Sequence, residues 1–166
     1  MALIRLNNQS LTAVSALPAG LDTGKVLQVQ TATTSTSTAI TSTTFADTTL
    51  TASITPSSTS SKILVITSSF IDARSSDGQS GAGIRLLRDT TTLFSDTGGN
   101  AFFINAATSS GATVIKGRMS TNYLDSPSTT NALTYKIQGR GTTSNDTVTF
   151  QHNSYVSMIT LMEIAG

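Results

Sequence analysis

Hydrophobic and polar residues alternate in short runs along most of this chain, a pattern typical of β-strands. The densest apolar run covers residues 154–164 (SYVSMITLMEI). Within it, Met158 and Met162 fall on one face of the predicted strand, and Ile159 and Leu161 fall on the other. Both faces are therefore mainly apolar. This indicates a strand covered on two sides, either in the centre of a sandwich or against another subunit.

The pattern predicts about eight to ten strands, separated by turns at the spacing of an all-β sandwich or barrel. No segment of the globular part shows a sustained helical period, and there is no heptad seam. We therefore expect an antiparallel β-sandwich. The expected strands cover residues 25–30, 61–73, 84–87, 92–94, 101–107, 113–123, 132–139 and a final segment from 148, with the Thr/Ser tract 31–44 as an edge strand or extended segment.

Residues 1–24 are expected to form an extended N-terminal arm, and residues 25–166 the β-sandwich domain. Pro18 and Gly20 interrupt the end of this arm. The alternative is a frayed chain terminus. As an arm, the segment would dock on another protein through its spaced apolar side chains, Leu3, Ile4, Leu6, Leu11 and Val14.

The composition adds an unusual surface to this picture. The chain has 166 residues, of which 37% are hydrophobic, enough to fill the core of one domain. Only 11% are charged, and roughly a third are Ser or Thr. A surface of hydroxyl groups with few charges fits a protein whose faces are partly covered by partners.

Charge and cysteine content exclude several classes of function. The formal net charge of +1 provides no basic field for nucleic acid. The absence of Cys excludes disulfides and thiolate metal sites. The N-terminus lacks the pattern of a signal peptide, and the apolar run at 154–164 is too short to span a bilayer as a helix, so no membrane insertion is expected.

The sequence offers no set of residues that predicts an enzyme, a cofactor or a metal site. His152 is the only histidine, and we expect it to be a hydrogen-bonded or interface residue rather than a base. Most acidic residues are expected in turns, where they accept hydrogen bonds from local backbone amides. These residues are Asp77, Asp89, Asp96, Asp125 and Asp146.

Glu163 is an exception, because it lies within the apolar final strand. One interpretation is an exposed residue near the end of the chain. The other is an ion pair across a subunit contact, since an unpaired buried carboxylate is costly. The basic residues considered as partners are Arg85, Arg88, Lys116 and Arg118.

Three tyrosines, Tyr123, Tyr135 and Tyr155, offer an apolar ring together with a hydroxyl group. Such side chains suit a sugar-binding surface. Packing in the core or at a subunit interface is the more common use of tyrosine, and both interpretations remain open from the sequence.

Two resemblances cover most of the chain. The order of segments 62–70, 84–94 (IRLLRDTTTLF), 133–139 and the final strand resembles the trimeric jelly-roll heads of the C1q/TNF-like class. The start (MALIRLNNQSLTAV), the Thr/Ser tract and the close (SMITLMEI) resemble small structural proteins of marine tailed bacteriophages. Together these resemblances imply a jelly-roll fold, a homotrimer and a place in a virion that assembles in the host cytoplasm.

The chain has no long repetitive shaft, so a capsid decoration or head fibre is favoured over a full tail fibre. Its partners would be other virion proteins of the capsid or tail. We expect the trimer interface to involve Tyr155, Met158 and Met162. The alternative function is a receptor- or glycan-binding head that contacts the host surface through the loops 74–83, 95–100, 124–131 and 140–146.

Overall fold

A computed structural model describes residues 24–76, 79–95, 102–105 and 113–166. In these residues it contains eleven β-strands and one short 3₁₀ turn, with no α-helix, which confirms the all-β prediction. The elements are β1 (Val26–Thr34), β2 (Thr38–Ile40), β3 (Ala46–Ile54), β4 (Lys62–Ser75), β5 (Gln79–Arg88), β6 (Thr91–Ser95), β7 (Phe102–Asn105), β8 (Thr113–Asp125), β9 (Leu133–Gly141), β10 (Asp146–Phe150), η2 (His152–Ser154) and β11 (Ser157–Ile164).

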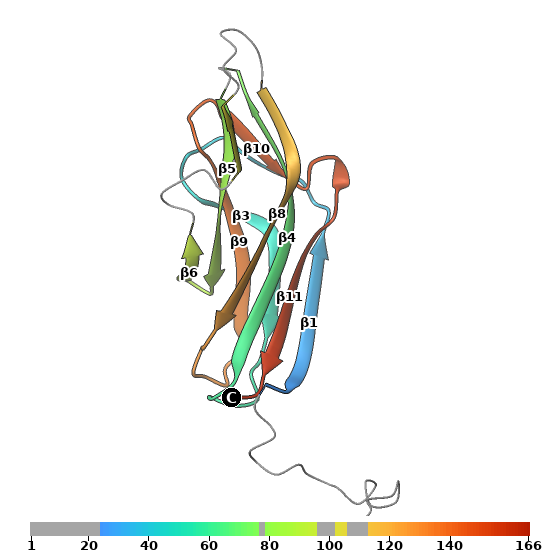
Figure 1. The fold of residues 1–166 in the computed structure, drawn as a ribbon, viewed down its shortest axis with the longest axis vertical. Helices are drawn as coiled ribbons and strands as arrows, with labels where there is room; N and C mark the ends of the chain where they lie inside the picture. Colours follow the sequence, from blue (N-terminus) through green and yellow to red (C-terminus); the bar gives the residue numbers. More distant parts are fainter. Residues whose placement is uncertain (1–23, 77–78, 96–101, 106–112) are drawn as a thin grey trace, which may run out of the picture.

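The strands form two antiparallel sheets that pack face to face (Figure 1). In sheet A, β4 pairs with β8 along one edge and with β11 and then β10 along the other, while β1 and β2 lie outside β11 and β10. In sheet B the order is β3–β9–β5, with β6 and β7 on the remaining edge of β5. The chain passes repeatedly from one sheet to the other, which gives the jelly-roll strand order and confirms the predicted fold.

The core lies between the inner faces of the two sheets. Alternation places every second residue of each long strand inward, as β9 illustrates with Leu133, Tyr135 and Ile137. β11 contributes Ile159 and Leu161, which are fully buried. The dense apolar run of the sequence is therefore a central strand of sheet A, held between β1 and β4.

Several predicted boundaries are wrong. The expected loop 74–83 is mostly strand, because β4 continues to Ser75 and β5 begins at Gln79. β8 extends the ladder with β4 as far as the pair Thr113↔Ser75, and this pairing holds the polar end of β4 in the sheet. The prediction of edge strand or extended chain for the Thr/Ser tract 31–44 is confirmed for part of it, since β1 continues to Thr34, β2 covers Thr38–Ile40, and both are edge strands of sheet A.

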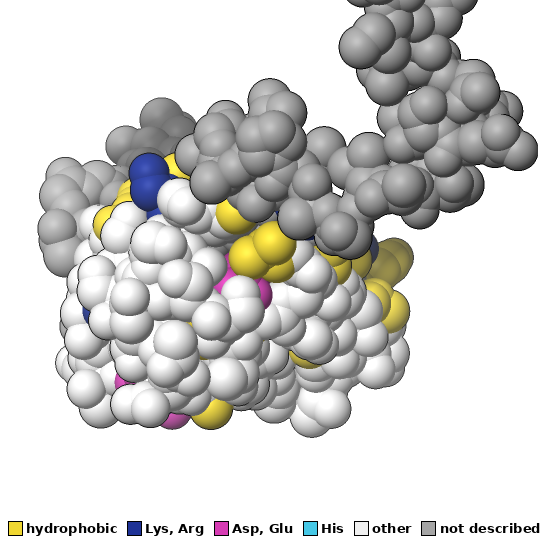
Figure 2. All heavy atoms as spheres, turned by 90° about the horizontal axis from the view of Figure 1, so that it is seen from below, with side chains coloured by type: hydrophobic (Ala, Val, Ile, Leu, Met, Phe, Trp, Pro, Cys, Tyr) yellow, Lys and Arg dark blue, Asp and Glu magenta, His cyan; other side chains and the backbone are white. Residues whose placement is uncertain are grey.

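The two ends of the described chain meet at one pole of the sandwich. The Gly24 amide donates to the Ala165 carbonyl at 3.1 Å, and the Ala165 amide donates to the Lys25 carbonyl at 2.8 Å. We call this end the terminal pole and the opposite end, near Ser75 and Asp146, the distal pole (Figure 1). Figure 2 looks onto the terminal pole, where backbone and uncharged polar groups cover most of the visible surface, as the composition predicts.

Gly139 of β9 lies in close contact with Phe150 of β10 in the opposite sheet. A Cβ atom at this position would lie 2.1 Å from a ring carbon of Phe150, which is fully buried. We expect Gly139→Ala to lower the free energy of unfolding by about 3 kcal/mol, because the ring has no free space to enter. Urea unfolding measures this. Gly83→Ala is the control, since its Cβ would meet only the side chain of Arg140, at 3.0 Å, and a loss of similar size there would contradict the prediction.

Candidate interaction surface on the outer face of sheet A

The outer face of sheet A, which points away from sheet B, carries a row of apolar side chains. Strand pairing aligns Val29 of β1 with Met162 of β11, Met162 with Leu64 of β4, and Leu64 with Leu124 of β8. Paired residues of neighbouring antiparallel strands project to the same face. These four residues, which we call the apolar row, therefore cross four of the six strands of sheet A. Val29 is 49% exposed and Leu124 is 51% exposed.

Two further exposed apolar residues extend the apolar row toward the distal pole. Ile66 lies two residues beyond Leu64 on the same face of β4, and Met158 of β11 lies further along, opposite Ser68. The strand neighbours of Ile66 are polar, because it pairs with Thr160 of β11 on one side and with Asn122 of β8 on the other. A single solvent-exposed apolar residue is ordinary, but a connected set on one sheet face is typical of an interaction surface.

The outer face of sheet B differs, because its charged and polar side chains interact with one another. Asp47 of β3 accepts hydrogen bonds from Lys136 at 2.9 Å and from Gln138 at 2.5 Å, both on β9. The guanidinium groups of Arg85 and Arg140 lie over the ring of Phe45, 4.7 Å and 5.1 Å from its centre. A polar face of this kind is stable in contact with water. Among the described strands, only those of sheet A present a connected apolar surface.

All three residues predicted for a trimer interface lie on the outer side of sheet A. Met162 belongs to the apolar row, and Met158, which is 41% exposed, lies four residues earlier on the same face of β11. Tyr155 lies outside the regular strands, is 51% exposed and stacks on Phe70 of β4 with a centroid distance of 4.3 Å. The interface itself stays a prediction. The predicted docking residues Leu3, Ile4, Leu6, Leu11 and Val14 lie outside the described residues.

An outward excursion between β10 and β11 delivers Tyr155 to this face. The pairs Phe150↔Ile71 and Met158↔Ser68 leave seven residues, 151–157, opposite only two residues of β4. The surplus residues leave the sheet. This excursion differs from the sequence-based expectation that Val148 and Phe150 lead directly into the final strand.

The excursion has a strained backbone that is held at its base. Gln151, Asn153 and Ser154 have φ angles of 54°, 54° and 59°, in the left-handed region that costs a non-glycine residue about 1 kcal/mol or more. The Gln151 amide donates to the carbonyl of Phe70 at 3.0 Å, and the Ser157 hydroxyl oxygen accepts from the Phe70 amide at 2.9 Å. These hydrogen bonds fix both ends of the excursion to β4.

A charged cluster lies beside the excursion on the same face. Asp72 of β4 is fully buried and accepts two hydrogen bonds from Arg74, at 2.8 Å and 2.9 Å. Lys116 Nζ of β8 lies 3.4 Å and His152 Nδ1 lies 3.2 Å from the same carboxylate. Burial raises the pKa of Asp72, but the hydrogen bonds and positive charge of Arg74, with the other two groups, outweigh it and lower the pKa below its ordinary value.

Asp72 is not among the residues predicted from the sequence, because its partners come from separate parts of the chain. Lys116 reaches it only through the β4–β8 register, in which the two residues pair directly. The alternation of Phe70, Asp72 and Arg74 on one face of a strand was the available signal. The prediction of a hydrogen-bonded or interface role for His152 agrees with its half-buried place beside this carboxylate.

Glu163 fits neither interpretation offered by the sequence. Its side chain is fully buried, and it accepts hydrogen bonds from Gln28 at 2.6 Å and from the backbone amide and hydroxyl of Ser57 at 2.7 Å and 2.6 Å. Burial raises its pKa, but these hydrogen bonds dominate and lower the pKa of Glu163 to about 2. The carboxylate ties β11 to β1 and to the loop after β3.

Asp125 was predicted in a turn, and this is wrong, because it is the last residue of β8 and is buried. Its carboxylate accepts from Arg88 at 2.7 Å and from the hydroxyl of Tyr135 at 2.7 Å, so it joins sheet A to sheet B. Burial and, to a smaller extent, the neighbouring carboxylate raise the pKa of Tyr135.

Asp146, at the start of β10, is also buried. It caps its loop as expected, because its carboxylate accepts hydrogen bonds from the backbone amides of Thr142 and Thr143.

The three tyrosines do not form a common sugar-binding surface. Tyr135 is fully buried in the core and Tyr123 packs partly buried against it. Tyr155, on the excursion, is half exposed. Of the three, Tyr155 therefore presents the most ring surface to a ligand.

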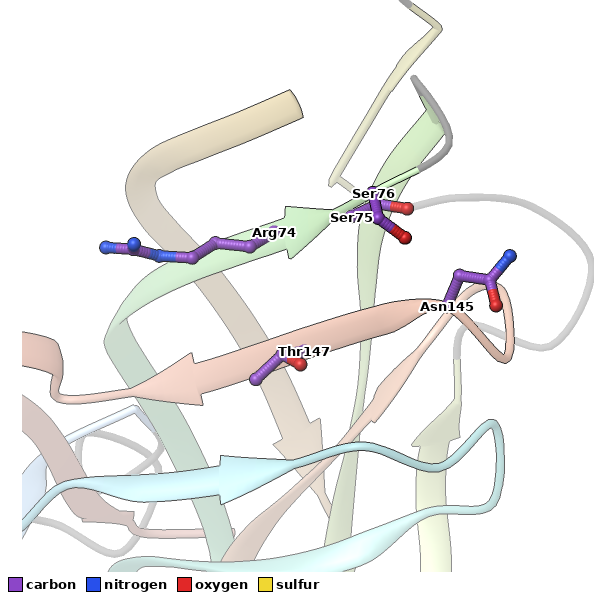
Figure 3. A pocket seen from close by; sticks show the side chains of 5 residues that line it. All are labelled: Arg74, Ser75, Ser76, Asn145 and Thr147. Atoms are coloured by element: carbon purple, nitrogen blue, oxygen red, sulfur yellow. The ribbon is translucent and has the colours of Figure 1, made fainter. Parts of the chain in front are cut away.

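The four predicted recognition loops do not share one pole. Segments 74–83 and 140–146 meet at the distal pole, around a hollow of about 340 Å³ lined by Arg74, Ser75, Ser76, Asn145 and Thr147 (Figure 3). In Figure 3 the side chain of Arg74 points away from Ser76 and Asn145. The loop 124–131 lies at the terminal pole, because the pair Asp125↔Ile63 is close to the start of β4. Residues 96–100 lie outside the described residues.

The described part of the chain holds no group of three or more His, Cys, Asp or Glu side chains that would bind a metal ion. Among the same residues, no helix is long and apolar enough to cross a membrane.

Comparison with known proteins identifies no relative that assigns a function. No protein-family model and no curated protein matches the sequence. A solved structure with some similarity is the dimeric latent PorU from Porphyromonas gingivalis, with 13% sequence identity and a TM-score of 0.33. The match covers 88% of this chain and 14% of that one. This likeness carries no argument about function.

Glu163 gives the fold a pH dependence of defined sign. Its pKa is about 2 in the folded protein against an ordinary value of 4.5, so the unfolded chain binds more protons between these values and stability falls as pH falls through them. The carboxylate is expected to contribute about 3 kcal/mol above pH 5. Glu163→Gln should therefore be less stable than the wild type at pH 7, and the difference should shrink toward pH 2. Urea unfolding at both pH values measures this, and a difference that is the same at both would contradict it.

Proposed function

We propose that this chain is a bacteriophage virion structural protein, a homotrimeric jelly-roll knob that its N-terminal arm anchors to the particle as a capsid decoration or head fibre. The observation that carries the proposal is the apolar row on the outer face of sheet A. In a monomer, the side chains of Val29 and Leu124 would be about half exposed to water, and those of Met158 and Ile66 would also be exposed.

Association through this face removes apolar surface from water. Complete burial of one Leu, Met or Val side chain contributes about 1.5–3 kcal/mol relative to full exposure. Val29 and Leu124 start about half exposed, whereas Leu64 and Met162 are already partly buried and gain less. Identical copies around a closed symmetry axis each bring the same residues to the contact. The number three comes from the resemblance to C1q/TNF-like heads.

The place in a virion rests on the resemblance of the start, the Thr/Ser tract and the close to small phage structural proteins. The geometry of the described chain is compatible with an anchor. Gly24 and Ala165 pair at the terminal pole, so an arm formed by residues 1–23 joins the sandwich there. The distal pole would then point away from the particle.

The oligomeric state tests the apolar row. We expect the wild-type protein to sediment at three times the 17.2 kDa of one chain. Leu124→Asp places a charge in the row on the edge strand β8, and it should dissociate the trimer because the charge would lose its water at the contact. Sedimentation velocity on both proteins measures this.

Ser53→Asp is the matched control, because Ser53 lies on the outer face of sheet B and is exposed. It should remain trimeric. A monomeric wild type, or a Leu124→Asp variant that sediments like the wild type, would contradict the proposed interface.

Deletion of residues 1–23 tests the anchor and leaves the hydrogen bond between Gly24 and Ala165 in place. The shortened protein should fold and form trimers, but it should be absent from purified particles when expressed during infection. Circular dichroism, sedimentation and immunoblotting of particles provide the three readouts. Loss of the fold, or normal incorporation into particles, would count against a docking arm.

A further inference from the structure

Cations and one exposed aromatic pair gather on the distal half of the outer face of sheet A, beyond the apolar row. Arg74 and Lys116 are about half exposed around the buried carboxylate of Asp72. Arg118 pairs directly with Phe70 across the β4–β8 ladder and so projects beside the ring that Tyr155 covers. Three cationic side chains against one carboxylate leave an excess of two positive charges, before any charge on His152.

Asp72 positions these cations and does not neutralise them all. It holds Arg74 through two hydrogen bonds and lies within 3.4 Å of Lys116, while it is itself shielded from solvent. The guanidinium of Arg118 donates a long hydrogen bond of 3.4 Å to the hydroxyl of Ser68. Among the described residues, no second acidic side chain faces this cluster, because Asp47 and Asp89 contact β9 of sheet B, and Asp125, Asp146 and Glu163 are buried in the interior.

The aromatic pair supplies a flat apolar surface next to the charges. Tyr155 and Phe70 stack at 4.3 Å with an angle of 26° between their rings, and half of Tyr155 is in contact with solvent. An exposed tyrosine ring with a hydroxyl group is suited to pack against the apolar face of a sugar. The strained residues Gln151, Asn153 and Ser154 place it there, and strain of this kind tends to occur at functional sites.

We propose that this surface, formed by Tyr155, Phe70, Arg118, Lys116 and Arg74, binds an anionic polysaccharide. The sugar ring stacks on Tyr155, and its carboxylate or sulfate group interacts with Arg118 and Lys116 through charge-assisted hydrogen bonds. The biological setting rests on the proposed function, because a knob on a particle surface meets the polysaccharides of a host envelope. The proposal requires Tyr155 to stay outside the contact between copies, so that Met158 and Met162 are the residues of the predicted trimer interface that such a contact would cover. The binding itself does not depend on the trimer.

Isothermal titration of the full chain with defined oligosaccharides tests the site. Alginate oligosaccharides carry carboxylates, sulfated dextran carries sulfates and neutral dextran carries neither. We expect binding of at least one anionic sugar and none of neutral dextran, and the stronger anionic sugar identifies the group recognised. Tyr155→Ala and Arg118→Ala should each weaken binding by about tenfold, which corresponds to about 1.4 kcal/mol.

Arg85→Ala is the matched control, because this arginine lies on the outer face of sheet B over Phe45 and should leave binding unchanged. Circular dichroism and sedimentation establish that each variant keeps its fold and oligomeric state.

Binding of polyphosphate tests whether charge alone explains the interaction. If polyphosphate binds as tightly as the anionic sugar and Tyr155→Ala has no effect, or if no sugar binds, the proposal is overturned. Neither result affects the trimer or its incorporation into particles, which have separate readouts.

Discussion

The pairing of β4 along both of its edges is the constraint on which the rest of the structure depends. β8 covers one edge from Ile63 to Ser75, while β11 and β10 share the other. This ladder fixes which residues of four segments point inward to the core and which point outward. A shift of one residue would exchange the two faces of a strand, so the buried Ile159 and Leu161 specify the register of β11. The same register aligns the apolar row and brings Lys116 to Asp72.

Two further features complete this framework: buried carboxylates, and the excursion between β10 and β11. Buried carboxylates join elements that hydrophobic packing alone would not orient: Glu163 links β11 to β1, and Asp125 links the end of β8 to Tyr135 in sheet B. Each has its hydrogen-bond partners, which keeps the cost of burial low. The excursion at 151–157 is the other device, because it places seven residues opposite two and so pushes Tyr155 and His152 onto the outer face.

Much of the fold could be predicted from the sequence, because alternation and turn residues act locally. The segment with Leu133, Tyr135 and Ile137 and the final apolar run are such cases. The candidate site could be predicted only in part. Met158 and Met162 follow from the apolar outer face of one strand, whereas the Asp72 cluster and the partners of Glu163 depend on pairing between segments far apart, such as Gln28 with the last strand. The excursion was missed because Phe150 and His152 alternate like a continuing strand, although the polar residues after Phe150 were the signal of a break.

The central claim is that contact between copies of this chain covers the apolar row and Met158 on the outer face of sheet A. Oxidation of methionine by peroxide, read by mass spectrometry, tests it at the residues concerned. Met158 is exposed in a single chain and Met119 is buried in its core, so Met119 is an internal reference. The account predicts that Met158 of the wild type oxidises as slowly as Met119, and that it oxidises rapidly in Leu124→Asp. Rapid oxidation of Met158 in the wild-type protein would contradict the account.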